Sequence, residues 1–308
     1  MMANIAELLA ERNQIKDRLS KMIYGSVEFR ERGGKKYIYV HYREDGNLLS
    51  KYAGEFSNEL YNLILENSSL AKELKKRLRG INKALSLLSY KEEELDPKVE
   101  LNIDFARKNL VSSIYKQSAL EGVATTYSDT ETLVEGGKVS DMTAEDVTKV
   151  VNLKHAWEFI LSKGVVEYPT NYQLLCQINS IVEEGFSYTA GSLRSVPVSI
   201  SGCHYIPPIP FESQVKEEIA SLFGSKKEPV SIAIDLLLYV MRKQIFLDGN
   251  KRTAVIFANH FLIRQGLGLI VIPAERVEEY KKLLVAFYET DDKEEISAFL
   301  KDKCLMAL

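Results

Sequence analysis

Two cations stand where a helix is expected to begin, directly after a glycine. Lys251 and Arg252 follow Asp248-Gly249-Asn250, and helical spacing of apolar residues resumes immediately afterwards. The first turn of a helix carries partial positive charge and ordinarily favours acids, so two cations there favour a bound anion. Asp248 could hold the divalent cation that such an anion brings. Gly249 permits the positive φ of a tight reversal, and Asn250 is predicted as the N-cap. An ordinary turn with solvated cations explains these charges equally well.

Two segments upstream of this loop have distinctive patterns. Gly191-Ser192-Leu193-Arg194 opens a stretch rich in Val, Ile, Gly and Pro that extends to Pro210. This composition predicts a β-hairpin over residues 191–210. Farther upstream, Ser118-Ala119-Leu120-Glu121-Gly122 predicts the end of a helix, with the glycine as its stop.

Together these three segments, in this order, resemble the Fic/Doc family. The family's active loop runs His-x-Phe-x-Asp/Glu-Gly-Asn followed by basic residues, between two helices. Residues 244–253 resemble that loop, with matches at Phe246, Asp248, Gly249, Asn250 and Arg252. The segment from 191 to 208 resembles the family's substrate-side flap, and residues 118–122 resemble the glutamate segment by which many members inhibit themselves. The resemblance covers roughly residues 105 to 300.

The resemblance implies a fold, a chemistry and a set of residue roles. It implies a mainly α-helical Fic/Doc core with a β-hairpin flap, and ATP or another nucleotide bound with Mg²⁺. Family members mostly transfer AMP from ATP to a hydroxyl of a target protein, whereas the Doc branch transfers a phosphate. Asp248 then corresponds to the Mg²⁺ ligand, Phe246 packs beneath the loop, and Glu121 is the regulatory residue. The phosphate cradle would comprise Gly249, Asn250, Lys251 and Arg252.

Four residues depart from the family pattern. Gln244 stands in place of the motif histidine that serves as the base, and a neutral amide cannot accept a proton at pH 7. Val255 stands where many AMP-transferring members carry a second arginine, and Lys251 also makes the loop more similar to the Doc branch. Gln117 replaces the usual Ser or Thr of the inhibitory segment. Because Val255 offers no charge to Glu121, we expect that Glu121 does not act as an inhibitory latch.

The four histidines offer little replacement for the missing base. His260 is ten residues beyond Asn250, about 15 Å along a helix, and is therefore expected to be out of reach. His155 is expected to be a packed or surface residue, and His41 belongs to the N-terminal region. His204, in the predicted flap, is the remaining alternative.

Three functions fit these residues. The first is a weak or degenerate Mg²⁺-dependent AMP or phosphate transferase, because phosphoryl transfer depends mainly on positioning and electrostatics. The second is an inactive nucleotide sensor or regulatory module that acts through the N-terminal region. The third is a protein- or nucleic-acid-binding module in which the loop is only structural. The sequence leaves open whether the protein is an enzyme.

The chain is predicted to form two domains, residues 1–95 and 96–308, and the second domain contains the loop and the elements that position it. Helical spacing over 5–23 and 55–88 encloses alternating sequence with turn signals at Gly33-Gly34 and Asp45-Gly46. This pattern predicts a helix–β-meander–helix arm, which we expect to recognise a partner. The family resemblance implies a protein target that docks on the flap, residues 191–210. The tip of this arm is basic and has tyrosines nearby, so it is the better candidate for contact with a partner. For a second basic cluster, which includes Lys72 and Lys75, a solvated helix face is favoured over a nucleic-acid surface.

Composition excludes several classes of protein. The 308 residues are 45% hydrophobic and 27% charged with a net charge of −3, values typical of a globular chain without long disorder. No apolar run approaches the roughly 20 residues of a membrane helix, and no signal peptide is expected. Three widely spaced cysteines predict reduced thiols and a cytoplasmic location. The oligomeric state is open, a homo-oligomer included.

Overall fold

The chain forms two compact units, residues Met1–Lys91 and Glu92–Leu308. The computed structural model describes residues 4–44, 47–91, 94–224 and 226–308. Most of these residues are helical, as the sequence predicted, and each unit has its own core. The predicted turn at Asp45-Gly46 lies outside the described residues.

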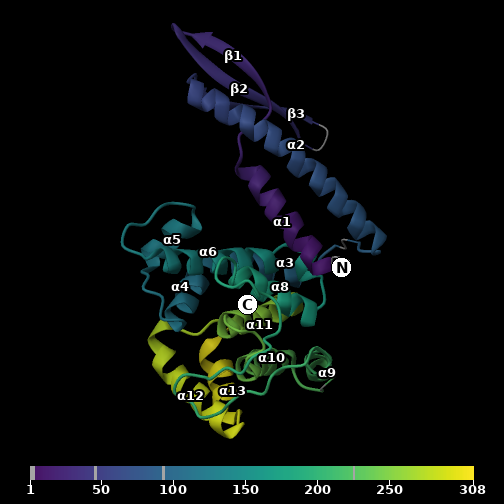
Figure 1. Cartoon of the computed structure of the whole chain (residues 1–308), viewed down its shortest axis with the longest axis vertical. Helices are drawn as coiled ribbons and strands as arrows, with labels where there is room; N and C mark the ends of the chain where they lie inside the picture. Colours follow the sequence, from purple (N-terminus) through teal and green to yellow (C-terminus); the bar gives the residue numbers. More distant parts are fainter. Residues whose placement is uncertain (1–3, 45–46, 92–93, 225) are drawn as a thin grey trace. The chain divides into compact units, whose positions relative to one another are not determined.

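Unit 1 consists of two helices and a three-stranded antiparallel sheet in the order β1-β2-β3 (Figure 1). Asn4 and Glu7 form a capping box at the start of α1, and the Ser57 hydroxyl accepts a hydrogen bond from the Leu60 N–H at 3.1 Å to start α2. The bounds are α1 Ile5–Lys21, β1 Ser26–Arg32, β2 Lys35–Glu44, β3 Asn47–Glu55 and α2 Asn58–Leu87. The predicted order of helix, meander and helix is confirmed.

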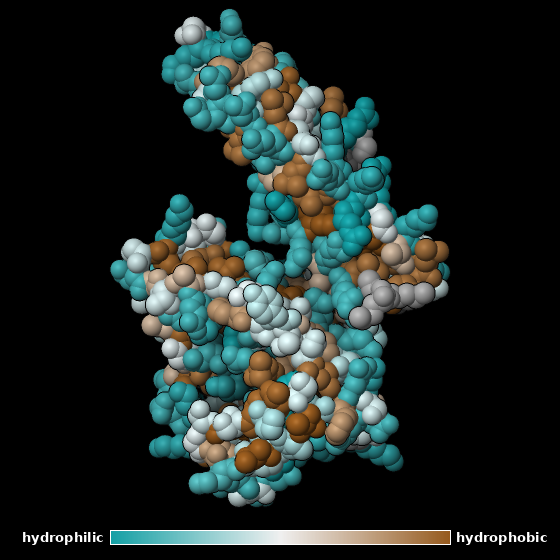
Figure 2. All heavy atoms as spheres, in the orientation of Figure 1, coloured by the Kyte–Doolittle hydropathy of each residue, from teal (hydrophilic) through white to brown (hydrophobic). Residues whose placement is uncertain are grey.

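One face of this sheet packs on α2. Ile38 and Val40 of β2 and Ile64 of α2 form a buried cluster between the sheet and α2, because alternate strand residues point to the same face. Gly33 and Gly34 take positive φ angles of 60° and 75° in the β1–β2 turn. This end of the sheet is covered by hydrophilic side chains (Figure 2). Among the described helices, none is both long and apolar enough to cross a membrane.

Unit 2 is built around α11, Asn250–Gln265. Almost every side chain of α11 is buried, as expected for a helix enclosed on all sides. It packs against α10 on one side and against α6 and α8 on the other (Figure 1). The other helices are α3 Pro97–Lys108, α4 Leu110–Leu120, α5 Tyr127–Val134, α6 Ala144–Ile160, α7 Lys163–Val166, α8 Tyr172–Val182, α9 Glu212–Phe223, α10 Pro229–Lys243, α12 Val277–Thr290 and α13 Glu294–Phe299.

Short elements complete unit 2. The pair β4 Leu269–Ile270 and β5 Leu305–Met306 is antiparallel, and the 3₁₀ turn η1 Ala274–Arg276 and the π-helical turn η2 Leu300–Cys304 flank α12 and α13. The hairpin predicted over 191–210 does not form, since these residues carry turns and extended chain without paired strands. Four prolines in this segment remove backbone donors that a ladder would need.

Candidate functional site

The loop between α10 and α11 reverses the chain at two residues with positive φ. Gln244 ends α10 with φ of 47°, and Gly249 precedes α11 with φ of 73°. Gly249 has the conformation predicted for it, and a Cβ atom there would lie 2.6 Å from Glu183 Oε1. Gly249, not Asn250, is the N-cap of α11. The prediction that Asn250 is the N-cap is therefore wrong.

Asn250 instead holds the loop from inside. Its side-chain oxygen accepts a hydrogen bond from the Phe246 N–H at 2.9 Å, and its amide donates to the Phe246 carbonyl at 2.9 Å. The amide also lies 3.2 Å from Gln244 Oε1, which accepts from it. Phe246 and Asn250 are both buried. One side chain thus satisfies backbone groups that water cannot reach.

Asn179, at the buried face of α8, connects the loop to residues 191–210. Its amide donates to the Asp248 carbonyl and to Thr253 Oγ1, both at 3.1 Å. Its oxygen accepts from the Gly191 N–H at 2.9 Å. The position of Asp248 is therefore set by a neighbouring helix as well as by its own turn.

Arg194 holds the other end of the loop. Its Nε donates to the Gln244 carbonyl at 2.5 Å, and its Nη2 donates to the carbonyls of Pro207 and Pro208 at 3.1 and 2.7 Å. Its Nη1 donates to the Val196 carbonyl at 2.8 Å. One buried guanidinium thus replaces the strand pairing that the predicted hairpin would have supplied.

Gln117 of α4 supports the first turn of α11. Its amide donates to the Arg252 carbonyl at 2.8 Å, and its oxygen accepts from the indole N–H of Trp157 at 3.0 Å. All three side chains are buried. The glutamine at this position therefore has a structural role between α4, α6 and α11.

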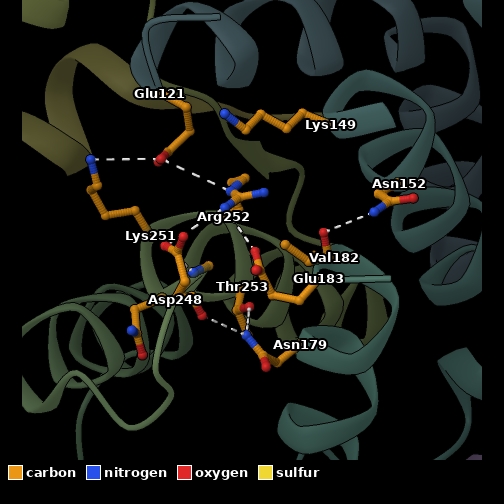
Figure 3. Close-up of polar contacts among 12 residues, drawn as sticks. Glu121, Lys149, Asn152, Asn179, Val182, Glu183, Asp248, Lys251, Arg252 and Thr253 are labelled. Atoms are coloured by element: carbon orange, nitrogen blue, oxygen red, sulfur yellow. Dashed lines mark hydrogen bonds and ion pairs between the residues drawn. The ribbon is translucent and has the colours of Figure 1, made fainter. Parts of the chain in front are cut away.

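Arg252 is the centre of a charged cluster (Figure 3). Its Nη2 lies 2.7 Å from Glu183 Oε1, and both side chains are nearly fully buried. Glu121 Oε2 lies 3.9 Å from Arg252 Nε and 3.7 Å from Lys251 Nζ. Asp248 Oδ1 lies 3.8 Å from Arg252 Nη2. Glu121 therefore does have cations to pair with, although Val255 offers none.

Arg252 retains unused donors in this cluster. Its Nε and Nη1 are buried and have no hydrogen-bond partner among the described residues. Glu121 Oε1 is also buried and without a hydrogen-bond partner in that part of the chain. Because leaving such groups unsatisfied costs about 1–3 kcal/mol each, or more when charged, the cluster fits a further polar group that completes these bonds.

A cavity of about 550 Å³ opens beside Arg252. Four carboxylates line it, against the cations Lys149 and Arg252, so the cavity as it stands is acidic. A free phosphate would be repelled there, whereas a phosphate that arrives with a divalent cation would not. The lining residues are Glu121, Glu145, Lys149, Glu183, Phe186, Ser187, Leu247, Asp248 and Arg252.

The comparison with family models decides what kind of loop this is. Residues 169–262 match the model of the Fic/DOC family, and they include α8, Arg194 and the whole loop. The chain contains a Fic/DOC domain. Glu121 lies outside the matched segment but contacts the loop of this domain through Lys251 and Arg252.

Solved structures share the fold of the Fic/DOC domain. Fic-1 residues 134–508 from C. elegans are 18% identical with a TM-score of 0.54, over 79% of this chain and 73% of that one. A Fic domain containing signaling protein from Bacteroides thetaiotaomicron is 22% identical with a TM-score of 0.51, over 62% and 76%. A Fic family protein from Desulfovibrio desulfuricans is 15% identical with a TM-score of 0.53, over 68% and 72%. No curated protein matches the chain.

Asp248 is the residue that the family resemblance predicts as the Mg²⁺ ligand. Its side chain is 76% exposed, so one carboxylate oxygen is accessible while Oδ1 accepts from the Gly249 N–H at 2.6 Å. Among the described residues, no group of three or more His, Cys, Asp or Glu side chains could hold a metal ion. A Mg²⁺ ion held here would therefore need phosphate oxygens and water beside Asp248, as is usual for this ion.

Gln244, which the family resemblance predicts at the base position, forms hydrogen bonds at both ends of its amide. Its nitrogen donates to the Met241 carbonyl at 2.6 Å, and its oxygen accepts from Asn250. A neutral amide accepts no proton at pH 7, and these bonds also occupy both of its ends. His260 is buried, with its ring nitrogens 2.8 Å from Thr170 and from the Val165 carbonyl, and burial lowers its pKa to about 4. His204 is exposed and lies beside Glu289.

Glu183 is a site residue that the sequence did not indicate. It follows the last turn of α8 and is buried against Gly249 and Arg252. Burial raises its pKa from 4.5 to about 7; Asp248 and Glu121 add to the rise, and Arg252 opposes it. Because the folded-state pKa is raised, the stabilising contribution of Glu183 is full below pH 4.5 and is lost as the pH rises through 7.

Replacing Glu183 by glutamine should remove this pH dependence. We expect the free energy of unfolding of the wild type, minus that of Glu183→Gln, to fall by roughly 3 kcal/mol between pH 4.5 and 7. Urea unfolding at several pH values measures this difference. Glu145→Gln, which removes an exposed carboxylate of the same cavity, is the control for net charge. A difference that stays flat or rises over this range would contradict the assignment.

Proposed function

We propose that the Fic/DOC domain binds a nucleotide together with Mg²⁺ at residues 244–253 and slowly transfers AMP or phosphate to a protein hydroxyl. The observation that carries this proposal is the pair of unused donors on buried Arg252, beside a cavity at the start of α11. Free backbone N–H groups at this helix end add to the attraction for phosphate. Bound Mg²⁺ would neutralise phosphate charge, with Asp248 as its protein ligand.

Each loop residue then has a task that its contacts support. Arg252 and Lys251 supply positive charge to the phosphates, and Asn250 keeps the backbone in the shape that presents its N–H groups. Gln244 can hydrogen-bond an incoming hydroxyl only if it gives up its contact with Asn250 or Met241. Transfer is therefore slow for two reasons, because the amide takes no proton and is already bonded.

A second function is favoured by the same glutamine. A Fic/DOC domain whose base position is closed by two hydrogen bonds suits a nucleotide sensor without transferase activity. In that case Glu121 and Glu183 would set the nucleotide affinity through Arg252. Binding alone is common to both functions, and transfer separates them.

Incubation with labelled ATP tests the proposal. We expect Mg²⁺-dependent heat on titration with ATP, and slow appearance of label on the protein itself or on an added target. Label from α-³²P-ATP indicates AMP transfer, and label from γ-³²P-ATP alone indicates phosphate transfer. Binding without label supports the sensor. The absence of heat with ATP, ADP and GTP at millimolar concentration would contradict both functions.

A further inference from the structure

Unit 1 contains a hollow of its own, between the C-terminal end of α1, the sheet and α2. Its volume is about 570 Å³. Lys16, Arg43, Lys51 and Lys75 contribute to its lining, together with Tyr24 and Tyr42, and no carboxylate is among the lining residues. The side chains that line the hollow thus carry four positive charges and no negative charge. The hollow therefore has a strong preference for negative charge.

The cations of this hollow are not used by unit 1 itself. The side chains of Lys16, Arg43 and Lys51 have no ion pair or hydrogen bond with a described residue, and Lys75 contacts a ring face rather than an acid. Other cations of the unit do have acidic partners. The pairs are Lys21 with Asp17, Arg30 with Glu28, Lys35 with Glu55, and Arg77 with Glu11. The four cations of the hollow thus have no acidic partner among the described residues.

Two tyrosines line both this hollow and a second one. Tyr24 and Tyr42 have ring centroids 6.0 Å apart, and Lys75 Nζ lies 4.7 Å from the centre of the Tyr24 ring. The second hollow, of about 600 Å³, shares Tyr24, Tyr42 and Lys75 and adds Lys72. The two hollows form one groove with cations along it and aromatic rings in the middle. A single small anion would occupy only part of its length.

We propose that this groove of unit 1 binds single-stranded nucleic acid. Repeated phosphates meet the cations from Lys16 to Lys72, and bases pack against the rings of Tyr24 and Tyr42, which is how strands are held without base pairing. An acidic peptide would satisfy the cations but has no flat bases to pack against the two rings. The charge pattern of the sequence favoured a solvated face for Lys72 and Lys75, and both residues also line the second hollow. The outer sheet face, with Tyr37, Tyr39 and Tyr52, is the weaker candidate because Glu28 and Glu55 pair with its cations.

Fluorescence anisotropy with the full chain tests the proposal, using labelled 12-residue oligo-dT and oligo-U at 50 to 200 mM salt. We expect binding that weakens with salt. Lys51→Ser with Lys75→Ser should weaken it at least about 10-fold and reduce the slope of log K against log salt by about 1.4, since each neutralised phosphate contributes about 0.7. Tyr42→Leu should weaken it by roughly 5- to 150-fold with the salt slope unchanged, because only stacking is lost.

The matched control removes the same charge from the outer face of the sheet. Arg32→Ser with Lys35→Ser should change the affinity by less than about 3-fold, since distant exposed charges are largely screened. Circular dichroism confirms that each variant keeps its helical content. Comparison of the two oligonucleotides shows whether the strand is DNA or RNA. The proposal is overturned if the two double variants lose equal affinity, or if no binding is detected at 50 mM salt. It is also overturned if a duplex or a polyglutamate peptide binds as tightly as the single strands. None of these outcomes depends on nucleotide binding at residues 244–253.

Discussion

Replacing Gln244 by histidine should raise transfer of AMP or phosphate at least 10-fold above the wild type. General-base catalysis is worth about 10²–10⁴-fold, and the substitution supplies the missing base at the position that matches the family loop. The site accepts the change, because the residue has φ of 47° and histidine is among the residues enriched at positive φ. Loss of the Met241 contact also frees the ring to face an incoming hydroxyl. Initial rates with both ATP labels measure the effect.

Two controls make this result specific. Gln244→Ala removes the same hydrogen bonds without adding a base, and it should leave transfer at or below the wild-type rate. Gln244→His with Asp248→Ala should lose the gain, since the carboxylate proposed to hold Mg²⁺ is absent. If the wild type already transfers rapidly and the histidine variant is no faster, the glutamine is competent or another base acts. His204→Ala then distinguishes these two cases.

Replacing Arg252 by glutamine should reduce the affinity for Mg²⁺-ATP by about 10- to 100-fold. A hydrogen bond to a charged group contributes about 1.5–3 kcal/mol, and Arg252 offers two unused donors to a phosphate. The same substitution strips buried Glu183 of its cation, which costs about 3–5 kcal/mol of stability for a broken buried pair. Calorimetry measures the first effect, and urea unfolding at pH 8 measures the second.

A paired variant separates binding from folding. Arg252→Gln with Glu183→Gln replaces the ion pair by two neutral amides of similar shape, so most of the lost stability should return while the affinity stays low. Lys251→Gln changes the net charge equally at a half-exposed position and should cost less affinity than Arg252→Gln. Affinity that recovers fully in the paired variant would show that Arg252 serves the fold rather than the phosphate.

The parts of the site that depend on local backbone rules could be predicted from the sequence. Gly249 was expected to take positive φ because a reversal between two helices needs it, and α10 and α11 were expected from their apolar spacing. The prediction of the N-cap of α11 was wrong because the side chain of Asn250, a good capping residue, binds the buried Phe246 backbone instead. The propensity of a residue for the N-cap position does not show whether a buried backbone group competes for its side chain.

Contacts between distant segments could not be predicted in this way. Asn179 lies on α8 and Glu183 directly follows it, and the apolar spacing of this helix gives no sign of the loop that they contact. The prediction of a hairpin at 191–210 was wrong for a related reason, because Arg194 donates hydrogen bonds to carbonyls that strand pairing would have used. Glu121 was expected to lack a cation at position 255, but helix packing places it beside two cations one turn earlier.

Arg194 links the loop to residues 196–208, so the two segments can be transplanted to another protein only together. Its guanidinium binds carbonyls on both sides, so neither segment keeps its shape if the other is exchanged without it. A chimera that grafts residues 244–253 onto another helical scaffold would leave the Gln244 carbonyl without its donor. The smallest exchangeable cassette in this domain therefore begins before Arg194, includes α9 and α10, and ends inside α11.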